Sequence, residues 1–531
     1  MFVIMACYDD LSPDQKKLPI PEILGLMLQH AGVSITITSV TDIIAFLIGS
    51  STIIPSLQSY CFYAAISVFM TFVFAVTFFC ACFALDQKRI QYKVNGMLPC
   101  ILYTDYEVNK CSQKQMSNRT FHFIFDKVIL KTPVKIIIIL ITIGLAAISI
   151  SNSLKLEQRF DPHWFVPKTD QLHTFFEKRS ELYPNFGFEG GIYMGAINYT
   201  HEIPKIRDIV MNLKNNSDII IEVVDWVNPF RNFVKKIFFT DIYQEELDDI
   251  HFNLYLSKFL IDPKYAKFQS NFQFEHPLEC GIPASKIEMA YIPFNFPIFH
   301  GPSEYIPAMH SVRKIAENAN FTTGDKFCTA WSYTFATWVT DEVIDIEVLR
   351  NLELALLSVM MCTVILVADL QTCFWIFICV LLSMINVCGF MQLWGLTIDL
   401  VSCIGLELAI GLCVDYATHI GHTFLTVSGT RRERALKTIT SIGSAVLYGG
   451  LSTLIGVLML SFSEAYTFQA FFKIFFLVIS FGLYHGVIVM PVILSMIGPN
   501  PYINIHKKKI HQIELEETKC METREKESIE T

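Results

Sequence analysis

Long apolar segments separated by polar ones limit the fold of this chain more than any other feature. A helix needs about 20 apolar residues to cross the roughly 30 Å hydrocarbon core of a bilayer, and eight segments are long enough. Soluble domains contain about 25% charged residues, whereas this chain is 17% charged and 52% hydrophobic. We therefore predict a polytopic α-helical membrane protein. The spans are expected at about 31–54, 58–85, 133–150, 349–367, 373–393, 400–427, 438–462 and 468–497.

A polar segment, residues 152–348, interrupts the apolar series and is long enough for a folded domain. Within it, GGIYMGAI at 190–197 and IIIEVVDW at 219–226 favour strands, and AMHSVRKIAENA at 308–319 favours a helix. The segment is therefore predicted to be an α+β domain. The aromatic run YIPFNFPIF at 291–299 fits either the core of this domain or a ligand cavity.

Lysine and arginine residues predict the orientation, because cytoplasmic loops carry an excess of them. Positive clusters occur in 86–132, at Arg431–Arg434 and at Lys507–Lys509, and an eight-span path puts all three on one side. We predict a plasma-membrane protein with both termini in the cytosol and with 152–348 outside. The polar stretch after Tyr502 is predicted to be disordered. The expected parts are 1–30 (cytosolic lead-in), 31–85 (two spans), 86–132 (cytosolic linker), 133–151 (one span), 152–348 (extracellular domain), 349–497 (five spans) and 498–531 (cytosolic tail).

An extracellular location would allow covalent modification of the polar segment. N-x-S/T sequences predict glycans at Asn198, Asn215 and Asn320. Of the 15 cysteines in the chain, Cys280 and Cys328 fall in this segment, so one disulfide between them is plausible. No CxxC or zinc-type spacing accompanies them, and we predict neither a metal site nor a cofactor. The chain has no basic stripe with interleaved aromatics, so nucleic-acid binding is not expected.

One apolar run contains ionisable residues, in the stretch GLELAIGLCVDYATHIGH from Gly405 to His422. A charge near the bilayer centre costs roughly 2.5–3.5 kcal/mol on insertion scales, and such residues usually mark an ion path or a proton relay. Asp415, His419 and His422 share one helix face. We identify Asp415 and His419 as candidate relay residues. Alternatively, the two histidines lie at a cytosol-facing end of the helix.

Three further residues of this stretch are weaker candidates. Gly411 lies on the strip beside Asp415 and would let another backbone approach closely. Glu407 lies about two helical turns from Asp415 toward the outer side and is a candidate second ion-binding residue. Tyr416 is a candidate that assists the relay. The pair His419 and His422 forms HxxH without the glutamate of HExxH metalloproteases, so no catalytic residue and no enzyme activity are predicted.

Asp42 is the charged residue of the first pair of spans. It either has a functional role or is bonded to Thr38 or Ser39. It lies in AGVSITITSVTDIIAFLIGS, from Ala31, which aligns without gaps with IGSAVLYGGLSTLIGVLMLS, from Ile442. Repeated halves are a known transporter plan. Because five spans follow the polar segment but fewer precede it, we expect the chain to be truncated at its start.

These motifs resemble Patched-related proteins of the resistance–nodulation–division (RND) superfamily. AGVSITITSVTDIIAFLIG resembles the end of a sterol-sensing domain, and GLCVDYATHIGHTFL resembles the tenth-span motif of Patched relatives. WGLTIDLVSC, RERALKTITSIGSAVLYGGLSTLIGVLML and FFKIFFLVISFGLYHGVIVMPVILSMIGP fit the same family in order. The resemblance covers roughly residues 20–500 and is loosest in the polar segment. It implies an RND-type bundle with eight of twelve spans and one of two extracellular domains.

The resemblance also implies a function. Family members handle sterols or other lipids, and acidic residues of the fourth and tenth spans are thought to form an ion-coupling pair. Asp415 matches the tenth-span residue, and the fourth-span motif has no counterpart, so Asp415 is expected to lack its partner. We predict sterol or lipid efflux coupled to a proton or cation gradient. The alternatives are a Patched-type receptor or scaffold that binds a secreted protein ligand, and a truncated inactive form.

Overall fold

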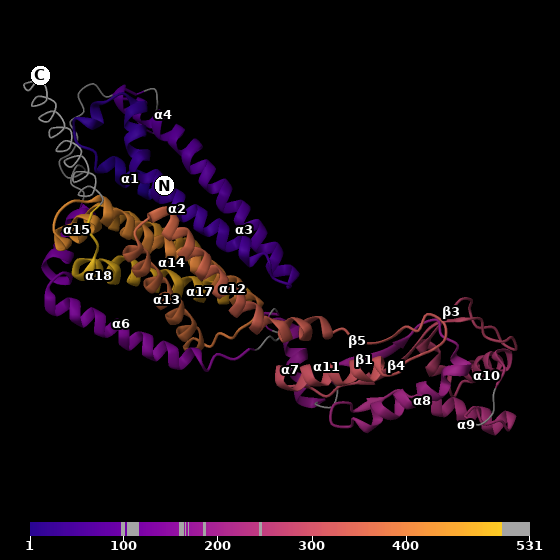
Figure 1. Cartoon of the computed structure of the whole chain (residues 1–531). Coiled ribbons are helices and arrows are strands. Elements are labelled where there is room, and N and C mark those ends of the chain that lie inside the picture. The colour runs from indigo at the N-terminus through magenta and orange to yellow at the C-terminus, as the bar shows by residue number, and fades with distance from the viewer. Residues whose placement is uncertain are drawn as a thin grey trace, which may run out of the picture. The chain divides into compact units, whose positions relative to one another are not determined.

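The computed structural model describes residues 1–96, 101–102, 116–158, 164, 166–167, 169–183, 187–243 and 247–501. The chain divides into two compact units, each with its own hydrophobic core (Figure 1). The membrane unit contains Met1–Phe160 and Ile344–Thr531, and the α+β unit contains Asp161–Val343. The tail predicted to be disordered, including Lys507–Lys509, lies outside the described residues.

Eight helices are long and apolar enough to cross a membrane, which confirms the predicted number of spans for the described residues. Their bounds are Ala31–Gly49, Pro55–Gln91, Thr132–Ser153, Phe335–Val367, Leu370–Leu393, Leu400–Thr426, Arg431–Phe462 and Tyr466–Ile497. The fourth span belongs to a helix, α12 (Phe335–Val367), that begins earlier than the predicted start at 349. Its first half carries charged residues from Asp341 to Glu347, so hydropathy alone does not recognise that part of the helix.

Proline and capping residues set several helix starts in the membrane unit. Helices α2 (Ile20–Gly49), α3 (Pro55–Phe74) and α6 (Thr132–Ser153) have proline in the first two helical positions, where a missing N–H removes no helical hydrogen bond. Asp399 and Ser402 form a capping box at the start of α14 (Leu400–Thr426). The other helices are α1 (Phe2–Asp9), α4 (Cys80–Gln91), α5 (Met116–Ile124), α13 (Leu370–Leu393), α15 (Arg431–Thr438), α16 (Ser444–Leu458), α17 (Tyr466–Leu483) and α18 (Met490–Ile497), with 3₁₀ or π turns at Gln15–Lys17, Ala75–Phe79, Phe125–Ile129, Ile439–Gly443, Met459–Phe462 and Tyr484–Val489.

Helix α14, which carries the predicted relay stretch, lies in the interior of the membrane unit (Figure 1). Within its most apolar window 67% of the residues are buried, compared with 11% for the span Pro55–Gln91. Glycines allow its neighbours to pack closely: a Cβ on Gly405 would lie 2.8 Å from Ile474 of α17, and one on Gly421 would lie 3.0 Å from Thr372 of α13. A polar side chain on α14 is therefore placed among protein groups, where it needs a partner.

The α+β unit is built on an antiparallel sheet with strand order β2-β4-β1-β5, and β3 also pairs with β4. Its elements are α7 (Gln171–Leu182), β1 (Glu189–Met194), α8 (Tyr199–Asn215), β2 (Glu222–Val223), α9 (Val227–Phe238), α10 (Asp249–Ile261), a 3₁₀ turn (Ala266–Asn271), β3 (Phe272–Phe274), β4 (Ile287–Asn295), α11 (Pro302–Glu317) and β5 (Cys328–Ser332). The strand predicted at 219–226 is shortened to β2, because Asp225 accepts hydrogen bonds from the N–H groups of Val227 and Asn228 and starts α9.

One face of this sheet forms the core. Ile192 of β1 and Phe294 of β4 are 0% and 1% exposed and pack in one cluster with residues of α8 and α11. Phe296, in the aromatic run 291–299, is also fully buried in this cluster. The structure therefore supports the core interpretation of that run for these phenylalanines.

The predicted disulfide between Cys280 and Cys328 is wrong in this structure, since both are free cysteines. Cys328 begins β5 and is held opposite Met194 of β1 by the sheet register. Cys280 lies in an exposed turn between β3 and β4. Counting cysteines identified two candidates but could not test whether the fold brings them together.

Candidate ion-coupling site

Helices α2 and α14 lie side by side in the membrane unit and meet through polar groups at three levels. Gly49, Asp42 and Ser34 of α2 lie beside Glu407, Gly411 and His419 of α14, respectively. From one contact to the next, the residue number decreases along α2 and increases along α14. The two helices are therefore antiparallel. The interface therefore contains a row of polar groups that extends along most of the span.

At the middle level, the carboxyl groups of Asp42 and Asp415 lie near each other. A Cβ on Gly411 would lie 2.6 Å from Oδ1 of Asp42, so the absence of a side chain there makes room for this carboxyl group. Asp42 and Asp415 lie close enough for their charges to interact. The Oδ1 atoms of both are buried and have no hydrogen-bond partner among the described residues. Two neighbouring carboxylates without a counter-charge repel each other, so this arrangement favours a shared proton or a bound cation.

The arrangement changes two expectations about this level. Asp415 was expected to lack an acidic partner, and this is wrong because α2 supplies Asp42. Gly411 was expected to let another backbone approach, and the group that approaches is instead the Asp42 side chain. Thr38, a predicted bonding partner of Asp42, donates its hydroxyl hydrogen bond to the carbonyl of Ile35.

At the third level, nearer the end of α14, His419 contacts α2. Its Nδ1 lies 2.5 Å from Oγ of Ser34, a residue that is 1% exposed. A neutral imidazole has one donor and one acceptor nitrogen, so the serine can donate to it or accept from it. His419 thus lies one helical turn from Asp415 on the side of α14 that faces α2.

Tyr416 lies in a different environment from its neighbour Asp415. A Cβ on Gly482 would lie 2.7 Å from the Tyr416 ring, and a Cβ on Gly486 would lie 2.8 Å from its Cβ. Tyr416 is therefore packed onto the last span, at the point where α17 passes into a π turn. This contact joins the helix that carries Asp415 to the last span.

At the first level, nearer the start of α14, Glu407 is 9% exposed and contacts α2 and α3. The Cys61 thiol of α3 donates to its Oε2 at 2.6 Å, and a Cβ on Gly49 would lie 2.7 Å from the same oxygen. Asn351 of α12 lies beside this carboxyl group, and Oε1 has no hydrogen-bond partner in the part of the chain that the structure describes. Sequence reasoning missed Cys61, because a cysteine in an apolar run carries no signal of its tertiary neighbour.

The described residues contain no group of three or more His, Cys, Asp or Glu residues that could hold a metal ion.

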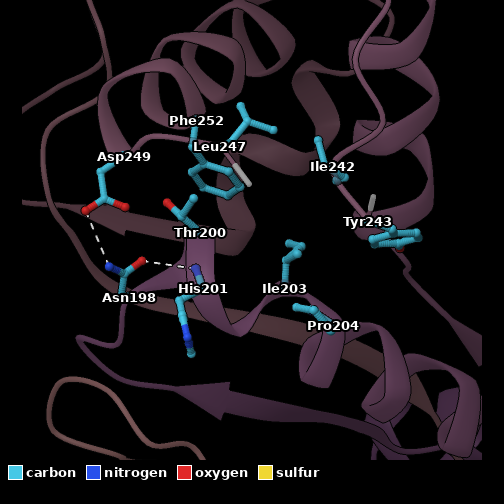
Figure 2. Close-up of a pocket in the computed structure, with 10 residues that line it drawn as sticks. All are labelled: Asn198, Thr200, His201, Ile203, Pro204, Ile242, Tyr243, Leu247, Asp249 and Phe252. Atoms are coloured by element: carbon cyan, nitrogen blue, oxygen red, sulfur yellow. Dashed lines mark hydrogen bonds between the residues drawn. The ribbon is translucent and has the colours of Figure 1, made fainter. Parts of the chain in front are cut away.

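The predicted glycosylation sites remain predictions, and the structure places their side chains differently. Asn215 and Asn320 are exposed. Asn198 is half-buried at a cavity of about 480 Å³, where its Oδ1 accepts from the N–H of His201 and its Nδ2 donates to Asp249 (Figure 2). Asn198 thus caps the start of α8.

Comparison with known proteins gives consistent matches. A family model described as the sterol-sensing domain of SREBP cleavage-activation matches residues 1–103. Patched-related protein 9 of Caenorhabditis elegans is 25% identical over 500 residues, which cover 92% of this chain and 56% of that protein. These matches confirm the resemblance to Patched-related proteins.

Two further matches extend the comparison. The NPC intracellular cholesterol transporter 1 of Sus scrofa is 22% identical over 90% of this chain and 42% of its own length. The cryo-EM structure of the hedgehog release protein Disp from the water bear Hypsibius dujardini aligns with a TM-score of 0.59 and 15% identity, over 90% of this chain and 60% of that one. The predicted RND-type fold is therefore confirmed. The chain spans about half the length of the curated relatives it matches.

Proposed function

We propose that this multi-pass membrane protein moves a sterol or another lipid and couples the movement to a proton or monovalent cation. The observation that carries the proposal is the buried pair Asp42 and Asp415, whose Oδ1 atoms have no hydrogen-bond partner among the described residues. Unpaired carboxyl groups inside a bundle are costly, and they are usually found on ion paths.

The comparisons support the lipid part of the proposal. One family match is a sterol-sensing domain, and one relative is a cholesterol transporter by name. We propose the plasma membrane as the location, with both termini in the cytosol and the α+β unit outside.

We assign a separate task to each level of the α2–α14 interface. Glu407 receives the ion from the outer side, and the Asp42–Asp415 pair binds it at the centre. His419 passes a proton toward the inner side through its contact with Ser34, since the two ring nitrogens of an imidazole can accept and donate a proton. Tyr416 transmits a change at Asp415 to the last span through its contact with Gly482 and Gly486.

The experiment is lipid transfer by the purified full chain in proteoliposomes with an imposed pH or sodium gradient. The substitutions Asp42→Asn and Asp415→Asn should each lower gradient-driven sterol transfer about hundredfold, the scale on which positioned proton-transfer groups contribute. Glu353→Gln, which neutralises an exposed carboxylate of α12, is the matched control and should have no effect. Transfer that is unchanged in both aspartate variants would disprove the coupling role.

The same variants distinguish the receptor alternative. A receptor that binds a secreted ligand through the separately folded α+β unit should keep its affinity in Asp415→Asn, because the substitution lies in the other unit. Wild-type protein without lipid transfer, but with ligand binding that is insensitive to Asp415→Asn, would favour the receptor.

A further inference from the structure

A groove of about 720 Å³ opens beside β4 in the α+β unit. β3 pairs with β4 as far as Ala290, and β2 pairs with it from Phe294. Tyr291 and Pro293, which line the groove, lie between these two pairings. The groove therefore forms where the edge of β4 passes from one short partner strand to the other.

A buried amide nitrogen without a hydrogen-bond partner among the described residues lines this groove. Asn271 is 3% exposed, and its Nδ2 has no hydrogen-bond partner in the described part of the chain. A buried donor that stays unsatisfied costs about 1–3 kcal/mol, so a ligand oxygen that accepts from it would gain free energy. Asn228, Asn232 and Ser270 add further neutral polar groups to the lining.

The residues that line the groove carry equal numbers of positive and negative charges. Lys214 and Lys267 are offset by Glu222 and Asp225, and Lys214 lies 2.7 Å from Asp225 in an ion pair. A site for an anionic ligand would need an excess of positive charge. The groove suits a neutral polar ligand instead.

Aromatic rings continue the groove onto the face of the sheet opposite the core. Residues alternate between the two faces of a strand, so Tyr193 and Tyr291 point away from the core that contains Ile192 and Ile292. The two tyrosine rings stack with centroids 5.1 Å apart and planes 7° apart, and Trp331, 52% exposed, lies edge-on to Tyr193. Such rings offer flat, amphipathic contact area.

We propose that this groove and the adjoining rings bind a neutral oligosaccharide. The C–H face of a sugar ring packs on a flat aromatic side chain, while its hydroxyl groups donate to and accept from amides and paired charges. A purely apolar ligand would leave the Nδ2 of Asn271 unpaired, and an anionic ligand would find no excess of positive charge in the lining. The inference is independent of lipid transport.

The test uses the purified full chain in nanodiscs, with chitotetraose and maltotetraose as neutral probes and a heparin tetrasaccharide as the charged comparison. Saturation-transfer NMR and tryptophan fluorescence should detect binding of at least one neutral probe and weaker binding of heparin. Tyr291→Val, which keeps a strand-forming residue, should lower the affinity about tenfold. Asn271→Leu should lower it about tenfold as well while keeping the fold, because it removes an unpaired buried donor.

Phe175→Leu, which removes an exposed ring of α7 that does not line the groove, is the matched control and should bind like the wild type. Circular dichroism confirms that each variant is folded. The proposal is overturned if the folded wild type binds neither neutral probe, if heparin binds more tightly, or if both groove variants bind within twofold of the wild type.

Discussion

Glu202 in the α+β unit and the Asp42–Asp415 pair in the membrane unit are buried carboxyl groups with opposite surroundings. Glu202 is 0% exposed, and its Oε1 accepts from the N–H and hydroxyl groups of Thr322 and Thr323, at 2.8 to 3.0 Å. Lys205 lies 2.9 Å from its other oxygen. The aspartate pair has unpaired oxygens. The first arrangement stabilises one charge state and one structure, whereas the second leaves room for an ion to bind and leave.

The sharpest test of this contrast is removal of the Glu202 charge. Glu202→Gln should destabilise the α+β unit by about 3 kcal/mol, because hydrogen bonds to a charged acceptor contribute about 1.5–3 kcal/mol each. Hydrogen exchange at the amides of Thr322 and Thr323 in the full chain measures the loss. Glu181→Gln, which breaks an exposed pair with Lys178, is the control and should change stability by less than about 1 kcal/mol. Equal protection of the two amides in the wild type and Glu202→Gln would remove the distinction.

Acidification should also destabilise the α+β unit, because it protonates Glu202. Burial alone would raise the pKa of Glu202, but hydrogen bonds from Lys205, Thr322 and Thr323 outweigh it and lower the pKa from 4.5 to about 2. Since the unfolded state then binds the proton more readily, this stability is fully present above pH 4.5 and is lost as the pH falls through about 2. Its maximum is about 3 kcal/mol. The measurement is the pH dependence of the protection factors of the Thr322 and Thr323 amides, which removes the intrinsic pH dependence of exchange, and in Glu202→Gln the loss near pH 2 should be smaller.

A smaller change should disturb the aspartate pair without altering its charge. Gly411→Ala would place a Cβ 2.6 Å from Oδ1 of Asp42 and displace that carboxyl group. We expect about a tenfold loss of gradient-driven lipid transfer, since misplacement of about 1 Å is costly in a positioned site. Gly449→Ala in α16 meets nothing within 4 Å and should leave transfer unchanged. Equal activities of the two alanine variants would show that the spacing at Gly411 does not matter.

The smallest expected effect is on the stability of the membrane unit. Asp415→Asn offers an amide donor to the unpaired oxygen of Asp42, so thermal stability should stay equal or rise by about 1 kcal/mol. This outcome is opposite in sign to that expected for Glu202→Gln. A large loss of stability in Asp415→Asn, measured by thermal unfolding in nanodiscs, would mean that the pair is structural.

Properties that depend on residues adjacent in the sequence could be predicted from it. The eight spans follow from local hydropathy, and Asp415 stands out because a charge in an apolar run is expensive. The partners of these residues depend on tertiary contacts. Nothing near Asp42 or Cys61 in the sequence indicates that they face Asp415 and Glu407. The incorrect disulfide has the same cause, because tertiary contacts also decide whether Cys280 and Cys328 meet.

The antiparallel pairing of α2 and α14 has a mechanical consequence. Its three polar contacts lie on two continuous helices rather than on loops, so they cannot be adjusted one at a time. An axial slide of α2 by one turn, about 5.4 Å, would separate Ser34 from His419, Asp42 from Gly411 and Gly49 from Glu407 together. The three polar contacts therefore open and close as a single set.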